Sequence, residues 1–146
     1  MKVPDLNLLI YAIDRQSHAH TSALRWWNEL LSGKETVGFS WTVLLGFLRL
    51  TTSPRIMRAP LTADEALDYI DRWLSHPITT VVDPTPRHPS VLRDLLGGVG
   101  TAGNLVSDAH LAALAIEHGA ELCSADHDFG RFPGLRWVNP VDPWPP

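Results

Sequence analysis

The sequence predicts an α/β fold of three layers, α/β/α, with a central, mainly parallel sheet. Two observations support this prediction. Short segments rich in β-branched and other apolar residues alternate along the chain with amphipathic segments of helical period, and this alternation is typical of parallel strands joined by helical crossovers. Apolar residues also make up 45% of the 146 residues, which is the content of a globular chain with a packed core.

The N-terminal half is expected to begin with a short buried strand over Lys2–Asp5, in which Pro4 removes one ladder hydrogen bond and indicates an irregularity. The helices that follow are predicted from apolar residues spaced three and four apart on one face. In chain order, the further elements are a helix over Asn7–Asp14, a helix over Thr21–Leu31 that stops at Gly33, a strand over Thr36–Ser40 and a very apolar helix over Trp41–Thr51.

In the C-terminal half, Thr62 and Glu65 form a capping box that predicts a helix running to about Leu74. Glycines mark the ends of two later helices. The further elements are a strand over Thr79–Val82, a short helix over Ser90–Leu96, a helix over Ser107–His118, and strands over Glu121–Ser124 and Arg136–Val138. We expect residues 1–146 to form a single domain, with residues 140–146 as a proline-rich C-terminal tail.

Charge and cysteine content narrow the possible functions. The net charge of −4 excludes general attraction to nucleic acid, so RNA binding needs a local basic patch or metal-bridged phosphates. The single cysteine, Cys123, permits no internal disulfide and lies in an apolar run, which favours a buried thiol in a reducing cytosol. No stretch approaches the ~20 apolar residues that span a bilayer. We therefore expect a cytoplasmic protein without membrane association.

Four acidic residues are candidates for a functional site: Asp5, Asp108, Asp126 and Asp128. Asp5 ends the first predicted strand, Asp126 and Asp128 follow the strand at Glu121–Ser124, and Asp108 opens a helix. Because ligands in parallel α/β sheets bind beyond the carboxyl ends of the strands, all four carboxylates are expected to converge at one edge of the sheet.

Each of these acids also has an ordinary structural interpretation. Asp108 suits the first turn of a helix, where the helix dipole favours a carboxylate, and Asp126 and Asp128 suit turns. Asp5 is the exception, because burying a carboxylate after an apolar strand costs several kcal/mol unless a cation or hydrogen-bond donors compensate.

Several motifs, in order along nearly the whole chain, resemble those of the PIN-domain family. Val3–Ala12 is similar to the start of a PIN domain, Asn104–Ala113 to its third acidic motif and Ser124–Phe129 to its last, which Phe132–Leu135 continues as in that family. Trp41–Arg49 resembles the VapC-type toxins of type II toxin–antitoxin pairs. The resemblance implies a PIN-like fold and a metal-dependent endoribonuclease that cleaves structured RNA, of the tRNA or rRNA class, and thereby inhibits translation.

The resemblance also implies roles for the acids. Asp5, Asp108 and Asp126 would hold Mg²⁺, or alternatively Mn²⁺, which would bind a phosphate oxygen and activate a water for in-line attack. Asp128 would complete the catalytic set by orienting that water or Asp126. Asn7 and Asn104 are expected to support the metal ligands; whether one or two metal ions act stays open.

One residue departs from the family pattern. Gly46 stands where most PIN domains carry a glutamate, so the implied metal site has one carboxylate fewer. Mg²⁺ usually keeps several waters and needs only one or two protein carboxylates, so the remaining acids can suffice. Two interpretations of Gly46 stay open: close helix packing, or a change in metal affinity and activity.

The resemblance implies three binding partners: a VapB-type antitoxin, the RNA substrate and a second copy of the chain in a homodimer. Arg49, Arg55 and Arg58 are candidates for RNA phosphate contacts, although a solvated surface explains Arg55 and Arg58 equally well. The tryptophans at positions 26, 27, 41 and 73 fit apolar helix faces, in the core or at an interface, better than base-stacking platforms.

Alternative functions are less well supported. Gly98–Gly103 matches a dinucleotide-binding glycine motif, but it follows a predicted helix instead of a strand. The histidines and Cys123 lack zinc-ligand spacing. Asp5–Asn7 also resembles the nucleophile loop of an aspartyl phosphotransferase, whose chemistry needs a cationic residue near the phosphoryl group. The only lysines are Lys2 and Lys34, and neither lies between the middle motifs. The remaining alternative is a catalytically weak or silent PIN module that binds RNA or a protein partner.

Overall fold

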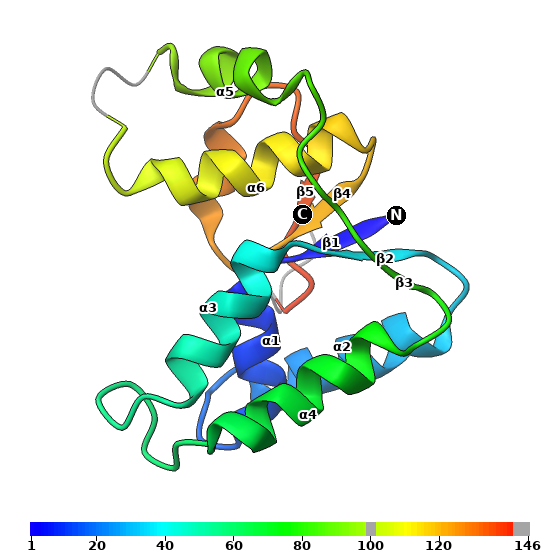
Figure 1. Ribbon diagram of the computed structural model, residues 1–146, viewed down its shortest axis with the longest axis vertical. Helices are drawn as coiled ribbons and strands as arrows, with labels where there is room; N and C mark the ends of the chain where they lie inside the picture. The colour runs from blue at the N-terminus through cyan, green and yellow to red at the C-terminus, as the bar shows by residue number, and fades with distance from the viewer. Residues whose placement is uncertain (99–101, 142–146) are drawn as a thin grey trace.

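The computed structural model describes residues 1–98 and 102–141 and has a five-stranded sheet at its centre (Figure 1). The strand order is β3-β2-β1-β4-β5, and every neighbouring pair is parallel. The strands are β1 (Lys2–Pro4), β2 (Val37–Phe39), β3 (Thr79–Val81), β4 (Glu121–Cys123) and β5 (Trp137–Val138). The parallel sheet that the sequence predicts is therefore confirmed.

Helices cover both faces of this sheet, which gives the expected three layers (Figure 1). One layer contains α1 (Leu6–Ile13), α2 (His20–Ser32), α3 (Trp41–Thr51) and α4 (Ala63–Leu74). The opposite layer contains α5 (His88–Leu96) and α6 (Leu105–Glu117), which pack against each other. A short 3-10 helix, η1 (His127–Arg131), follows β4.

Most predicted boundaries agree with the structure to within two residues. The helix at Trp41–Thr51 is confirmed at both ends. Both hydrogen bonds of the capping box are present, 2.7 Å from the Thr62 amide to Glu65 Oε2 and 3.1 Å from the Glu65 amide to Thr62 Oγ1. Helix α5 begins two residues earlier than predicted, because Pro89 lies in its first turn, where no backbone donor is needed.

The predicted irregularity at Pro4 is confirmed. Strand β1 pairs with β4 at three positions but with β2 only at Lys2, opposite Val37. The Lys2 amide donates to Thr36 on the β2 side, and the Asp5 amide donates to Cys123 on the β4 side. Donors on a strand alternate between its two neighbours, so the N–H that Pro4 lacks belongs to the β2 side. The chain therefore reaches Asp5 held mainly by β4.

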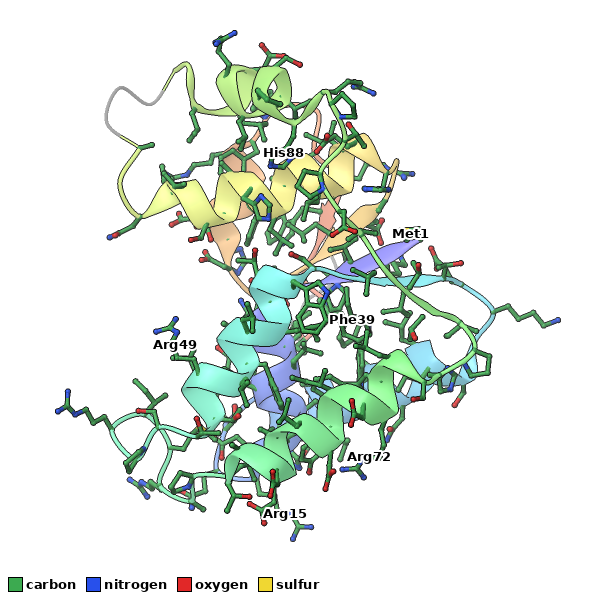
Figure 2. All side chains as sticks on the ribbon, in the orientation of Figure 1. Met1, Arg15, Phe39, Arg49, Arg72 and His88 are labelled. Atoms are coloured by element: carbon green, nitrogen blue, oxygen red, sulfur yellow. The ribbon has the colours of Figure 1, made fainter. Side chains whose placement is uncertain are left out.

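The two helical layers pack against the sheet with different side chains. On the α1–α4 side, the rings of Phe39 and Trp73 stack with centroids 5.9 Å apart, and Trp27 and Phe47 close the cluster edge-on. Figure 2 shows Phe39 pointing from the sheet into this layer. On the other side, α6 buries mainly alanines and leucines. The small alanine side chains let α6 lie close to the sheet, which brings its N-terminal turn to the carboxyl edge.

Two sequence features fall partly outside the described residues. The glycine motif at Gly98–Gly103 includes residues 99–101, but its first residue follows α5, so its predicted position after a helix is confirmed. The proline-rich tail includes residues 142–146, which likewise lie outside. None of the helices in the described part of the chain is long and apolar enough to cross a membrane.

Candidate active site

All four candidate acids lie at the carboxyl-terminal edge of the sheet, as expected. Asp5 follows β1 and is the N-cap of α1, where its carboxylate accepts a 2.7 Å hydrogen bond from the Leu6 amide. Asp126 and Asp128 follow β4, the neighbour of β1 in the sheet. Asp108 lies in the first turn of α6. Asp5, Asp108 and Asp126 are partly buried, and Asp128 is exposed.

A hydrogen-bond network around Ser124 joins the first and last acidic segments. The buried Ser124 hydroxyl donates to Asp5 Oδ2 at 2.6 Å and accepts a 3.0 Å bond from the Asp126 amide. Asn7 Nδ2 donates to Asp5 Oδ2 at 2.9 Å, while its Oδ1 accepts from the Ala125 amide at 3.3 Å. These bonds fix the Asp5 carboxylate against the loop that carries Asp126.

The pKa of Asp5 is raised above its usual value even with these donors. Burial is the main cause, and the nearby charge of Asp126 adds to it, while the bonds from Ser124 and Leu6 act in the opposite direction. Donors that hold the carboxylate in place thus offset only part of its desolvation, and the ionised form would gain from a cation.

The pKa of Asp108 is also raised above its usual value. Its pKa is raised to about 6, first by burial and then by the charges of Asp5, Asp126 and Asp128; Arg131 acts in the opposite direction. Since like charges raise a carboxyl pKa only when they are close, Asp108 lies within electrostatic range of the other three acids. The predicted convergence is therefore visible in the electrostatics as well as in the topology.

Asp126 and Asp128 also form local contacts within the loop and 3-10 helix that follow β4. Asp126 Oδ1 accepts a 2.8 Å hydrogen bond from the Asp128 amide and so caps η1. Its interpretation as a turn former is thus confirmed, and the role does not prevent its other oxygen from binding a ligand. Asp128 forms an exposed ion pair with Arg131 at 2.7 Å.

The donor set fits a hard divalent cation that keeps part of its water shell. Among residues 1–98 and 102–141, no group of three or more histidine, cysteine, aspartate or glutamate side chains lies close enough together to hold one metal ion. Asp5, Asp108 and Asp126 therefore do not form a closed cage. Mg²⁺ is usually held by one or two carboxylates and several waters, whereas zinc prefers nitrogen and sulfur ligands, so carboxylates with raised pKa values suit Mg²⁺ or Mn²⁺.

The packing interpretation of Gly46 is confirmed. Gly46 is buried in α3, and a Cβ atom at this position would lie 2.8 Å from Cδ2 of Leu6 in α1. The missing side chain lets α3 approach the residue that follows Asp5. Position 46 is thus close to the acidic edge, and its effect on metal affinity stays a prediction.

Other predicted residues are less closely tied to the site. Asn104 is the N-cap of α6, but its exposed side chain makes no capping hydrogen bond, so its expected support of the acids is not seen. Arg49, Arg55 and Arg58 are all exposed, and Figure 2 shows Arg49 projecting from α3 into solvent. Cys123 is buried, as predicted, and burial raises the pKa of its thiol to about 12, which leaves it unreactive.

Two residues of the site were not predicted from the sequence. Ser124 links Asp5 to Asp126, and the signal for it was a polar residue directly after the apolar pair Leu122 and Cys123 at the end of a predicted strand. Arg131 is a cation beside the acidic cluster. No sequence signal pointed to Arg131, because η1 brings it back toward Asp128 by a short turn that was not expected.

Comparison with known proteins agrees with this geometry. The family model described as the PIN domain matches residues 2–135. Ribonuclease VapC37 from Mycobacterium tuberculosis is 47% identical over 140 residues, which are 96% of this chain and 97% of that protein. Ribonuclease VapC33 from the same species is 40% identical over 141 residues, 97% of this chain and 99% of that protein.

Solved structures share the fold at lower sequence identity. VapBC2 from Rickettsia felis, bound to a DNA fragment from its promoter, matches with a TM-score of 0.69 at 22% identity, covering 94% of this chain and 97% of that one. Mycobacterium tuberculosis VapC20, described as a sarcin–ricin loop cleaving toxin, matches with a TM-score of 0.66 at 20% identity, covering 93% and 99%.

Proposed function

Since this chain belongs to the PIN-domain family and is a VapC-type ribonuclease of a toxin–antitoxin system, we propose that it cleaves RNA with a divalent cation held at its acidic edge. One observation carries the proposal. Asp5, Asp108, Asp126 and Asp128 come together at the carboxyl edge of the sheet, where burial and the three neighbouring carboxylates raise the pKa of Asp108 to about 6. A metal ion that binds a phosphate is the partner that would relieve this repulsion and serve phosphodiester hydrolysis.

Each residue of the edge has a distinct role in this proposal. Asp5 and Asp108 hold Mg²⁺ or Mn²⁺, and Asp126 completes the shell directly or through water. When bound, the cation polarises the phosphate and lowers the pKa of a water ligand. Asp128 accepts a hydrogen bond from the attacking water and so orients it. Arg131 offers a guanidinium to a phosphate oxygen at the same edge.

Ser124 and Asn7 position the first carboxylate. Both donate to Asp5 Oδ2, at 2.6 Å and 2.9 Å. With the Leu6 amide on Oδ1 at 2.7 Å, the carboxylate is held in one orientation before any ligand binds. Loss of such hydrogen bonds to a metal ligand typically lowers metal affinity or activity by about 10- to 100-fold.

We extend the proposal to substrate and partners. The substrate is structured RNA of the tRNA or rRNA class, and cleavage inhibits translation; VapC20, which shares the fold, is described as cutting the sarcin–ricin loop. The regulatory partner is a VapB-type antitoxin, since several solved relatives are VapBC complexes. A homodimer is supported by Trp41 and Leu45, which are 48% and 56% exposed one turn apart on α3.

The test is cleavage of purified RNA by the purified protein. Mg²⁺ or Mn²⁺ should permit cleavage, a chelator should abolish it, and added Mg²⁺ should restore it. Folded Asp108→Asn, purified in the same way and incubated in parallel, controls for contaminating ribonuclease. Cleavage that persists in excess chelator would contradict the proposed metal dependence.

A further inference from the structure

A cavity next to the acidic edge takes no part in the site described above. It has a volume of about 490 Å³ and lies between the end of α1, the start of α2 and the segments that follow β4 and β5. Its polar and aromatic lining consists of Tyr11, His18, Ser22, His127 and Asn139. The remaining lining residues are two alanines and a valine, so among residues 1–98 and 102–141 no acidic or basic side chain other than the histidines lines the cavity.

The cavity is directly continuous with the catalytic segment. His127 lies between Asp126 and Asp128 in the sequence, and Ala125, whose amide donates to Asn7 Oδ1, also lines the cavity. Tyr11 lines a second cavity of about 340 Å³ that includes Asp5 and Asn7. The Tyr11 side chain thus forms a wall shared by the cavity at Asp5 and the cavity at Asn139.

The chemistry of the lining suits an uncharged heterocycle. Tyr11 provides an aromatic ring, half-buried and 6.0 Å from the ring of His18 between centroids. Ser22 and Asn139 provide a hydroxyl and a carboxamide, and the Asn139 Oδ1 atom accepts a 3.1 Å bond from the Val141 amide, which fixes the carboxamide. Single-stranded RNA is recognised by stacking of splayed bases on aromatic rings and by hydrogen bonds to their edges.

The alternative occupants fit less well. A phosphate would need a cationic or amide cradle, and in the part of the chain that the structure describes neither lysine nor arginine lines the cavity. A long apolar peptide segment would need a continuous hydrophobic groove, whereas polar side chains interrupt this lining. A nucleotide fits the two cavities together. Its phosphate would lie at Asp5, where the proposed metal ion offsets the negative charges, and its uncharged base would lie on the other side of Tyr11, in the cavity that holds Asn139.

We propose that this cavity, the Tyr11 cavity, receives the base of a nucleotide adjacent to the scissile phosphate, with Tyr11 as its stacking surface and Asn139 as a specificity residue. The inference rests on the proposed ribonuclease function and adds a base-recognition subsite to it.

The experiment has two stages. First, the ends of the fragments that the wild-type protein makes from total RNA with Mg²⁺ are sequenced, which gives any base preference beside the cut. Then synthetic oligoribonucleotides that reproduce the cut RNA region with its fold are cleaved, each with one abasic position moved along the strand that is cut. Wild type is compared with Tyr11→Leu, Tyr11→Phe and Asn139→Ala. Tyr69→Leu, at the only other tyrosine, is the matched control, and melting curves check that each variant folds.

We expect one abasic position beside the cut to slow the wild type about tenfold, the order of magnitude of one base–aromatic stack. Tyr11→Leu should be slowed about as much on the intact strand and show no further loss at that abasic position, because the two changes remove the same contact. Tyr11→Phe, which keeps the aromatic ring, should keep the abasic penalty that Tyr11→Leu loses, and Asn139→Ala should change the preferred base. Tyr69→Leu should keep both the preference and the abasic penalty.

Two results would overturn the inference and can be told apart. If the wild type cleaves RNA but Tyr11→Leu keeps the full abasic penalty at every position, the Tyr11 cavity is not a base subsite and the ribonuclease proposal stands. If the folded wild type cleaves no RNA with Mg²⁺ or Mn²⁺, the proposed function fails and the subsite fails with it.

Discussion

The two ends of α6 carry carboxylates in opposite electrostatic states. At its N-terminal end, burial and three like charges raise the pKa of Asp108 to about 6. At its C-terminal end, burial also works to raise the pKa of Glu117, but hydrogen bonds from Thr85 and His88 lower it below its usual value. The Glu117 side chain is fully buried, and it accepts from the Thr85 amide at 3.0 Å and from His88.

The difference separates a structural carboxylate from a functional one. The hydrogen bonds from Thr85 and His88 offset the cost of burying the Glu117 carboxylate. They also join α6 to α5 and to the loop before it, and Figure 2 shows His88 lying between the two helices. His88 continues the chain of bonds to His110 at 2.9 Å. Asp108 is left with repulsion that the protein does not compensate. A cation-binding site is expected to keep carboxylate charges that the protein does not neutralise, because donors that neutralised them fully would remove the affinity for the cation.

The largest expected effect comes from removing the uncompensated charge. Asp5→Asn and Asp108→Asn should each lower RNA cleavage at least ~100-fold, the order of magnitude for loss of one strong electrostatic group in an active site. Metal-free stability should hold or rise in Asp108→Asn, since like-charge repulsion decreases; in Asp5→Asn the lost acceptor for Leu6, or for Ser124 and Asn7, opposes that gain. Cleavage assays and melting curves measure both, with Asp71→Asn, at an exposed residue of α4, as the control. Undiminished cleavage by either variant would contradict the assignment of that residue.

At the other end of α6, the expected effect is on stability. Glu117→Ala leaves His88 and Thr85 without their acceptor, and burying unsatisfied groups of this kind costs about 2 kcal/mol. The free energy of unfolding should fall by that amount in a denaturant titration, while cleavage per folded molecule stays near the wild-type value. Glu117→Gln, which keeps an acceptor, should lose less. A large loss of cleavage in folded Glu117→Gln would show that the two ends of α6 are functionally coupled.

Position 46 offers a way to add charge to the functional end. Gly46→Glu should tighten Mg²⁺ binding by up to ~10-fold, since affinity for a hard cation rises with the number of carboxylates and position 46 lies against Leu6, next to Asp5. The added Cβ meets only the end of the flexible Leu6 side chain, at 2.8 Å. Gly46→Gln has the same shape without the charge and is the matched control. Equal Mg²⁺ binding by the two variants would show that position 46 does not face the metal.

The smallest expected effect is a pH dependence of opposite sign at the two ends. Because the folded pKa of Asp108 is raised from 3.8 to about 6, the folded state binds more protons than the unfolded state in that interval, and metal-free stability should fall as the pH rises from about 4 to 6. Solvent screens this partly exposed group, so the change should not exceed ~1 kcal/mol.

Glu117 should act in the opposite direction. Its lowered folded pKa means that the folded state binds fewer protons, so its stabilisation is present above the usual glutamate pKa and is lost as the pH falls through the folded value. Metal-free melting curves from pH 3 to 7 (spanning the reference carboxyl pKa values near 4) should show the fall between 4 and 6 reduced in Asp108→Asn, where the raised pKa of Asp5 still contributes, and kept in Glu117→Gln. A fall of unchanged size in Asp108→Asn would place its cause elsewhere.

The same contrast shows what the sequence predicts and what it does not. Asp5, Asp126 and Asp128 follow strands that can be recognised from a few neighbouring apolar residues. Once those strands are assigned to a parallel sheet, the topology places the three acids at its carboxyl edge. The interpretation of Gly46 as a packing residue likewise needed only the expectation that α3 lies close to another element.

The remaining contacts depend on distances between segments far apart in the chain. Glu117 meets Thr85 and His88 across about thirty residues of sequence, and Ser124 meets Asp5 across 119. No local period encodes such pairs, because they arise when α5 packs on α6 and when β4 pairs with β1. Arg131 was missed for a different reason: η1 is a single short 3-10 segment, which leaves no helical pattern to recognise.

The most direct test of the central claim is calorimetric titration of Mg²⁺ or Mn²⁺ into the wild type, Asp108→Asn and Glu117→Gln at pH 7, where Asp108 is ionised. We predict that the wild type and Glu117→Gln bind the ion with the same affinity and that Asp108→Asn binds it at least ~10-fold more weakly, because affinity depends on the number of carboxylates in the shell. Equal affinity in all three folded proteins, or no binding by the wild type, would contradict the assignment of the acidic edge as the metal site.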